Sequence, residues 1–187
     1  MKHKRKVRHL LILGCFFICP IIGHADQTDQ TNQTTPFQLS LFHPAQIYPD
    51  YYSVDGFRLD LIYGVNQDLH GVDLGIVNNT KGEANAFELG VFNRVDRDYG
   101  GWQFGVVNEV KDDFNGFQLG LITNVTRGSF EGFQASVFFN DAQEKMQGFQ
   151  LGIVNYTGSL SGVQIGLFNF NDDIKYLGFF PFIDAAF

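Results

Sequence analysis

The segment GFQLGLITN (116–124) and its near copies decide how this chain folds. In this segment the apolar residues 117, 119 and 121 alternate with small or polar residues at 118 and 120. A period of two is typical of a β-strand with one apolar face, and no window after residue 25 shows the 3.6-residue spacing of a helix. We therefore predict an all-β chain.

The segment is one unit of a repeat that runs through most of the chain. Its consensus is Gly-apolar-Gln-apolar-Gly-apolar-apolar-Asn, followed by six to eight polar residues. The units begin 14 to 16 residues apart, at Gly56, Gly71, Ala86, Gly101, Gly116, Gly132, Gly148 and Gly162. PFQLSLF (36–42) is a degenerate first copy, and YLGFFPFIDAAF (176–187) is a modified last copy. A short fixed period predicts that like positions recur in space.

Three details describe the strand within each unit. The residue two before each unit, such as Phe114, is apolar, and strict alternation places it on the glutamine side. The seventh residue, such as Val107, is always apolar, and the same rule places it there too. In both 16-residue units the asparagine comes one place later, at Asn124 and Asn140, which predicts a local bulge.

One strand per unit gives about ten strands, at 37–42, 57–65, 72–79, 87–95, 102–110, 117–125, 133–140, 149–157, 163–170 and 176–187. Two architectures satisfy this pattern. In an antiparallel up-and-down β-barrel each unit is one strand plus a turn, and closure removes the sheet edges. In a β-solenoid of ~15-residue coils, like residues stack into Gln, Asn and Phe ladders.

The sequence favours the barrel and keeps the solenoid as the alternative. Ten tilted residues at ~3.3 Å rise cover about 25 Å, the height of an outer-membrane apolar band. A Phe/Leu/Leu stripe would face lipid and a Gln/Gly side would line the lumen. The chain ends on Phe187, in step with Ile183 and Phe179, and this last strand would pair with 37–42. The near-identical units, which show no alternation of long and short loops, favour the solenoid.

The N-terminus predicts export. Residues 1–9 are basic, residues 10–23 are apolar, and Ala25 ends a signal-peptidase pattern, so we predict a signal peptide at 1–25. A lipoprotein modified at Cys15 is the alternative. Residues 26–35 form a polar linker, and residues 36–187 form a single all-β repeat domain.

Composition excludes several functions. Lys and Arg number 13, five of them in the leader, against 20 Asp and Glu, so the exported chain carries a formal charge of −12. That balance excludes phosphate-driven nucleic-acid binding. Cys15 and Cys19 both lie in the leader, which excludes disulfides, zinc-thiolate sites and cysteine catalysis afterwards. We expect no enzyme, no cofactor and no metal.

Candidate site residues are few. Arg58 and Asp60 replace the usual Gln and Gly of their unit, and Asp73 and Glu88 stand at the Gln position of the next two. These four residues predict a polar patch that lines a lumen or forms a solvated face with cross-strand ion pairs. The pairs Asp112–Asp113 and Asp172–Asp173 are interpreted as turn formers rather than calcium ligands. His43 and His70 lie in loops without a catalytic partner.

Residues 36–50, 54–78 and the repeats to Phe187 resemble a family of exported bacterial surface-repeat proteins. The chain departs from that pattern at 94–100 and 132–141. The resemblance implies a surface or envelope location and no activity, cofactor or catalytic residue. We expect a non-enzymatic outer-membrane surface protein with a structural or interaction role and lipid as partner. Alternatives are a small outer-membrane pore or ligand-carrying barrel, or a periplasmic or extracellular β-solenoid that binds partners.

Overall fold

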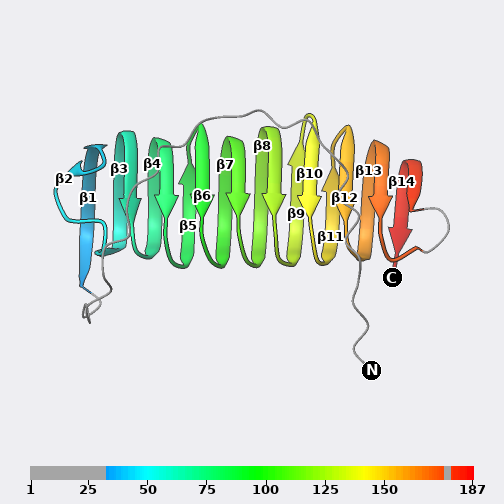
Figure 1. Cartoon of the computed structure of the whole chain (residues 1–187), viewed down its shortest axis with the longest axis horizontal. Coiled ribbons are helices and arrows are strands. Elements are labelled where there is room, and N and C mark those ends of the chain that lie inside the picture. Colours follow the sequence, from blue (N-terminus) through cyan, green and yellow to red (C-terminus); the bar gives the residue numbers. More distant parts are fainter. Residues whose placement is uncertain (1–32, 175–177) are drawn as a thin grey trace, which may run out of the picture.

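The computed structural model describes residues 33–174 and 178–187, and its strands form one continuous stack (Figure 1). The predicted signal peptide at 1–25 and most of the linker lie outside the described residues. The strands are β1 Thr34–Phe42, β2 Ala45–Gln46, β3 Ser53–Asn66, β4 Leu69–Thr80, β5 Ala84–Leu89, β6 Phe92–Val95, β7 Tyr99–Val110, β8 Phe114–Thr126, β9 Phe130–Ser136, β10 Phe139–Ala142, β11 Met146–Leu151, β12 Val154–Thr157, β13 Leu160–Asn171 and β14 Phe179–Ala186.

Each repeat unit is one coil of a β-solenoid. Neighbouring coils pair in parallel and in register, so Gly101 lies beside Gly116 and Gln103 beside Gln118. The stack has about nine turns, and 74% of it is strand. The all-β prediction and the predicted stacking of like residues are confirmed. The predicted barrel is wrong, and the solenoid alternative is the observed architecture.

A bend inside each unit explains why the barrel fails. A barrel needs each unit to run straight, but the chain turns between the fifth-position glycine and the asparagine. At that bend two consecutive apolar residues, such as Leu121 and Ile122, both face outward and are exposed. The alternation therefore changes phase, and the seventh residue points outward rather than to the glutamine side as predicted. A tight turn such as 111–113 then returns the chain to start a parallel strand.

The 16-residue units accommodate their extra residue at this bend. The register shifts between Gly105 and Val107, and Val107 pairs with Thr123 rather than with Ile122. Asn108 and Asn124 are consequently aligned again. This confirms the predicted bulge.

The two ends of the stack are closed differently from its middle. At the C-terminal end β14 pairs antiparallel with β13, and Phe187 is fully exposed. At the other end β1 pairs in parallel with β3 and antiparallel with the two-residue β2. The predicted pairing of the last strand with 37–42 is therefore wrong, because the stack grows away from its first coil and never returns to it.

The interior of the coils is largely polar. The Gln118 side chain is fully buried, whereas Phe117 and Leu119 on either side are only partly buried and Leu121 is exposed. This confirms that the apolar and glutamine positions take opposite faces. The apolar face, however, points out of the coil and the glutamine face points in, so burial is the reverse of a solenoid with an apolar core.

Two amide ladders run through this interior in opposite directions. Each Gln Nε2 donates to the Gln Oε1 one coil earlier, from Gln164 back to Gln103, at 2.6 to 2.8 Å. Each Asn Nδ2 donates to the Asn Oδ1 one coil later, from Asn78 to Asn169, at 2.8 to 3.0 Å. Because each amide both donates and accepts, the ladders meet most of the hydrogen-bonding demand of the buried groups.

Apolar rows complete the interior on either side of the amides. One row is stacked face to face, with ring centroids 5.0 Å apart for Tyr99 and Phe114 and 4.7 Å for Phe114 and Phe130. The Tyr99 hydroxyl donates to the Ala86 and Trp102 carbonyls at 2.9 Å each. Glycine at the start of a unit is required sterically, since Gly116 has φ = 135° and a Cβ there would overlap the Gly101 carbonyl oxygen.

Candidate functional site

The four predicted site residues do come together, inside the solenoid. Arg58, Asp73 and Glu88 occupy the glutamine column of the first three full coils, and Asp60 lies beside Arg58. All four are essentially inaccessible to solvent. They line no lumen and form no solvated face, because the solenoid turns the glutamine side inward.

Arg58 is the centre of this buried ionic column. Its guanidinium makes a two-point contact with the Asp73 carboxylate, with Nε donating to Oδ1 at 2.9 Å and Nη2 to Oδ2. The Asp60 Oδ2 atom lies 3.2 Å from Arg58 Nε. Burial alone would lower the pKa of Arg58, but Asp73 and Asp60 raise it above its usual range, so this side chain stays charged.

Glu88 joins the ionic column to the glutamine ladder. Gln103 Nε2 donates to Glu88 Oε2 at 2.7 Å. Burial, followed by the negative charge of Asp73, raises the pKa of Glu88 to about 8. Burial likewise raises the pKa of Asp60 to about 6, against the opposing effect of Arg58. At neutral pH Glu88 is mainly protonated, and the column carries less negative charge than its formula suggests.

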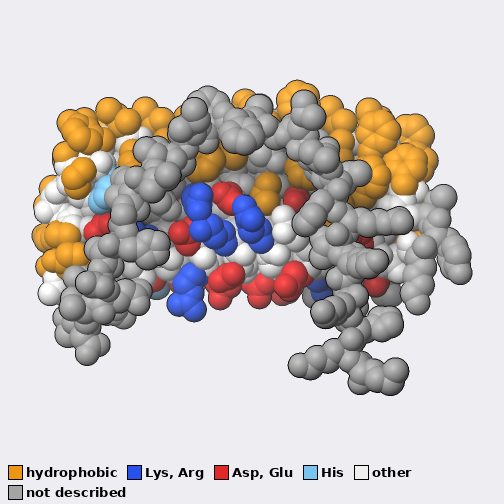
Figure 2. Space-filling model, in the orientation of Figure 1, with side chains coloured by type: hydrophobic (Ala, Val, Ile, Leu, Met, Phe, Trp, Pro, Cys, Tyr) orange, Lys and Arg blue, Asp and Glu red, His pale blue; other side chains and the backbone are white. Residues whose placement is uncertain are grey.

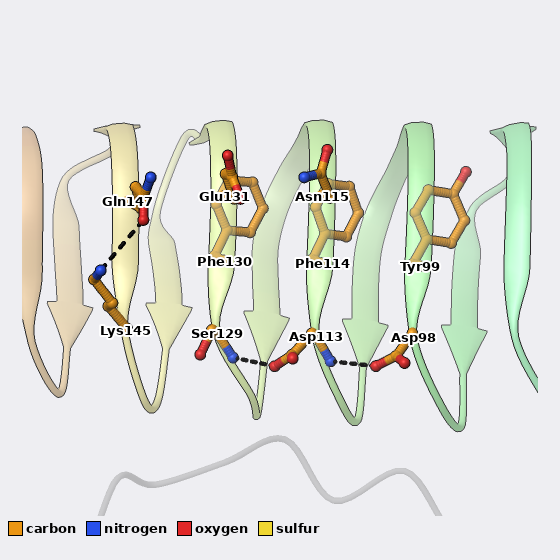
Figure 3. Close-up of a pocket in the computed structure, with 10 residues that line it drawn as sticks. All are labelled: Asp98, Tyr99, Asp113, Phe114, Asn115, Ser129, Phe130, Glu131, Lys145 and Gln147. Carbon is orange, nitrogen blue, oxygen red and sulfur yellow. Dashed lines mark hydrogen bonds between the residues drawn. The ribbon is translucent and has the colours of Figure 1, made fainter.

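The other predicted residues have structural roles at the edge of the stack. Figure 3 shows the Ser129 amide donating to Asp113 Oδ1 at 2.7 Å, and the Asp113 amide donating to Asp98 Oδ1 at 3.0 Å. These contacts join successive turns beside a depression of about 290 Å³. Asp172 accepts a hydrogen bond from the Tyr156 hydroxyl at 2.6 Å. His43 lies 3.9 Å from Asp50, and His70 is exposed.

In the described parts of the chain, no group of three or more His, Asp or Glu residues could hold a metal ion. Within the same ranges, no helix is long and apolar enough to cross a membrane.

The most extensive surface feature is an apolar edge that the sequence analysis did not treat as a site. We call it the apolar rim: the two outward residues at the bend of each coil. It comprises Leu41–Phe42, Leu61–Ile62, Ile76–Val77, Val91–Phe92, Val106–Val107, Leu121–Ile122, Val137–Phe138, Ile153–Val154 and Leu167–Phe168. Figure 2 shows hydrophobic side chains along this upper edge. The signal in the sequence was the adjacency of two apolar residues, which breaks strict alternation.

One outer face continues from the rim. We call it the aromatic face: the outward residues two and four places into each unit. It comprises Phe37, Leu39, Phe57, Leu59, Val72, Leu74, Phe87, Leu89, Trp102, Phe104, Phe117, Leu119, Phe133, Ala135, Phe149, Leu151, Val163 and Ile165. Rings stack along it, with centroids 4.7 Å apart for Phe117 and Phe133 and 5.3 Å for Phe133 and Phe149. No charged residue interrupts it.

The opposite outer face carries the residue after each interior asparagine, namely Asn79, Arg94, Glu109, Val125, Asp141, Tyr156 and Phe170. We call it the charged face after the ion pairs of its central coils, to which Arg127 of the adjoining turn contributes. Arg94 and Arg127 flank Glu109 across three coils, with N···O distances of 3.6 Å and 2.7 Å. Lys111 Nζ lies 2.7 Å from Asp96 Oδ1 at the turns below. Figure 2 shows Lys and Arg side chains in blue and Asp and Glu side chains in red below the apolar edge. The solenoid is thus amphipathic both from edge to edge and from face to face.

These features define a β-solenoid with an amide interior and an apolar exterior. No protein-family model matches the chain, and no curated protein or solved structure matches it either.

Proposed function

We propose that this protein is an exported, non-enzymatic component of the cell envelope that lies on the outer-membrane lipid surface, held there by its apolar rim, with a structural or interaction role. The observation that carries the proposal is the rim itself. It is apolar at all eighteen positions of nine successive coils, and Leu121 is 60% exposed. Soluble monomers rarely leave contiguous apolar surface of this extent in water.

The arrangement of residue types fits a membrane surface in an edge-on orientation. The rim forms one edge of the solenoid and is apolar throughout, with Phe at four of its eighteen positions, and charged turns form the far edge. Aliphatic side chains and Phe favour the hydrocarbon, whereas charged side chains are costly there. The order from edge to edge is therefore the order of environments from the membrane core to water.

The charged face limits how deep the rim can enter. Arg94 and Glu109 follow the rim by about two residues, and their ion pair would be costly to place in hydrocarbon. The depth that remains is roughly 5–10 Å, which is that of proteins lying in the interface rather than spanning it. The acidic turns lie about 20 Å from the rim at ~3.3 Å per residue. Since charges are screened over about 8 Å, they do not prevent approach to an anionic membrane.

The expected leader and the resemblance to surface-repeat proteins support an envelope location for this surface. The pore hypothesis requires a lumen, whereas the described coils enclose amide ladders and stacked rings. Nothing in the site favours catalysis: the buried ionic column has no access to solvent.

Vesicle flotation tests the proposal. The purified protein should float with phospholipid vesicles, and Leu121→Glu with Val137→Glu should reduce the bound fraction at least tenfold, since both side chains are exposed apolar residues of the rim. Asn115→Glu is the matched control, because Asn115 is exposed away from the rim beside Glu131 on the next coil. Wild-type protein that stays in the aqueous fraction would overturn the proposal and favour a secreted binding solenoid.

A further inference from the structure

We infer that the aromatic face packs against the same face of a second copy of this chain, giving a two-fold symmetric homodimer. The inference concerns a surface that the proposed membrane attachment leaves uncovered. If only the rim enters lipid, the aromatic face stands upright in water. The most exposed members of that face are Trp102, at 58% exposure, and Leu89, Leu151, Phe37 and Phe87.

Lipid does not cover this face in the edge-on orientation. The charged face lies on the other side of the same coils, so immersion as far as Trp102 would carry Arg94 and Glu109 into the membrane with it. Lying flat on the membrane would cover the aromatic face, but the rim residues that turn toward the charged face, such as Phe168, would then leave the lipid. The aromatic face of a second copy covers this face without placing charged residues in lipid and without removing rim residues from it.

The face has the area and the shape that a stable dimer needs. Its eighteen partly exposed side chains present on the order of 1,000 Å² per copy, against about 800 Å² per partner in ordinary stable complexes. It is the outer side of a regular parallel sheet, whose side chains repeat at the spacing of the strands. Two such faces pack as a sandwich with the sheets about 10 Å apart.

Symmetry fixes which residues meet. A two-fold axis parallel to the strands keeps both apolar rims on the same side and reverses the order of the coils. In the row two places into each unit, Trp102 is the fifth of nine residues. The axis therefore places Trp102 close to its own counterpart and brings Val72 opposite Phe133. A large aromatic residue at the centre of an interface is where binding energy concentrates.

Cysteine cross-linking tests this geometry. Cys15 and Cys19 are changed to serine, and Trp102→Cys is then treated with a short bis-maleimide, because a 10 Å gap is too long for a disulfide. Most of the Trp102→Cys chain should cross-link to a dimer, and Val125→Cys on the charged face should not. Val72→Cys alone should not cross-link either. It should do so when mixed with Phe133→Cys.

Sedimentation supplies a second measurement that does not depend on a thiol. Wild-type protein should sediment as a dimer, and Trp102→Glu should weaken the dimer at least 100-fold with an unchanged β-sheet circular-dichroism spectrum, because Trp102 touches no interior ladder. Monomeric wild-type protein would overturn the inference. Quenching of Trp102 by brominated lipids would overturn it as well, and would assign the face to the membrane. If the protein is monomeric and still floats with vesicles, the homodimer is excluded and the proposed membrane attachment is retained.

Discussion

The first and the later coils of the solenoid fill the same column in different ways. In β3 to β5 the column holds Arg58, Asp73 and Glu88, whereas from β7 to β13 it holds only glutamine. A glutamine amide donates on one side and accepts on the other, so it can be repeated without limit. A charged side chain cannot do this, and the ionic column works only because Arg58 lies between two carboxylates and Glu88 is protonated beside Gln103.

The shape of the coil is therefore set by the backbone register and not by one interior chemistry. The two amide ladders leave only their terminal oxygens, Asn78 Oδ1 and Gln164 Oε1, without a hydrogen-bond partner, while the ionic end leaves both Asp60 oxygens and Glu88 Oε1 without one. We therefore expect the N-terminal coils to depend more on single residues and on pH than the later coils do.

The largest effect is expected from removing the only cation of the ionic column. Arg58→Met leaves the Asp60 and Asp73 carboxylates buried without a counter-charge and should lower the free energy of unfolding by about 3–5 kcal/mol. Urea denaturation followed by circular dichroism measures it. Arg97→Met, at an exposed arginine 3.9 Å from Glu83, should cost less than about 0.5 kcal/mol. If both substitutions lower the free energy of unfolding equally, the buried ion pairs of the column stabilise the fold no more than a surface pair does.

The next effect is a dependence on pH that belongs to Glu88. Its pKa is raised from 4.5 to about 8 in the folded chain, so the folded state binds more protons than the unfolded state between these values. The free energy of unfolding should then fall as pH rises through this range, by up to about 5 kcal/mol. Glu88→Gln continues the amide ladder and should remove the fall between pH 6 and 8.

The remaining fall below pH 6 belongs to Asp60 and Asp141, whose pKa values burial raises to about 6. It should persist in Glu88→Gln. Glu144→Gln, at an exposed turn, should leave the whole profile as in the wild type. A profile that is identical in all three proteins would contradict the assignment to Glu88.

A smaller effect is expected from interrupting the amide ladder. Gln134→Leu leaves the Gln150 amide without its acceptor and Gln118 Oε1 without its donor, at about 2 kcal/mol. Gln147→Leu, at an exposed glutamine of the neighbouring coil, serves as the control and should change stability by less than about 0.5 kcal/mol. If Gln134→Leu lowers the free energy of unfolding no more than Gln147→Leu does, the amides do not stabilise the later coils.

Much of the fold could be predicted from the repeat, but its closure could not. The period of two, the bulges before Asn124 and Asn140 and the stacking of like positions all follow from spacing. Barrel and solenoid share that local pattern, and the deciding bend depends on two adjacent outward residues such as Leu121 and Ile122. The spacing of 15 residues also brings Arg58, Asp73 and Glu88 into one column. The position of this column inside the coil could not be predicted, because phenylalanine is usually buried in preference to glutamine.

Each coil of the solenoid buries its amide side and exposes its apolar side. Two arginine substitutions on β8, Gln118→Arg and Leu121→Arg, test this arrangement most directly. Gln118→Arg places an unpaired charge in the ladder and should prevent folding or cost at least about 3 kcal/mol. Leu121→Arg stands in water and should cost less than about 0.5 kcal/mol. If Leu121→Arg unfolds the protein while Gln118→Arg is tolerated, the apolar side is the core and this account is wrong.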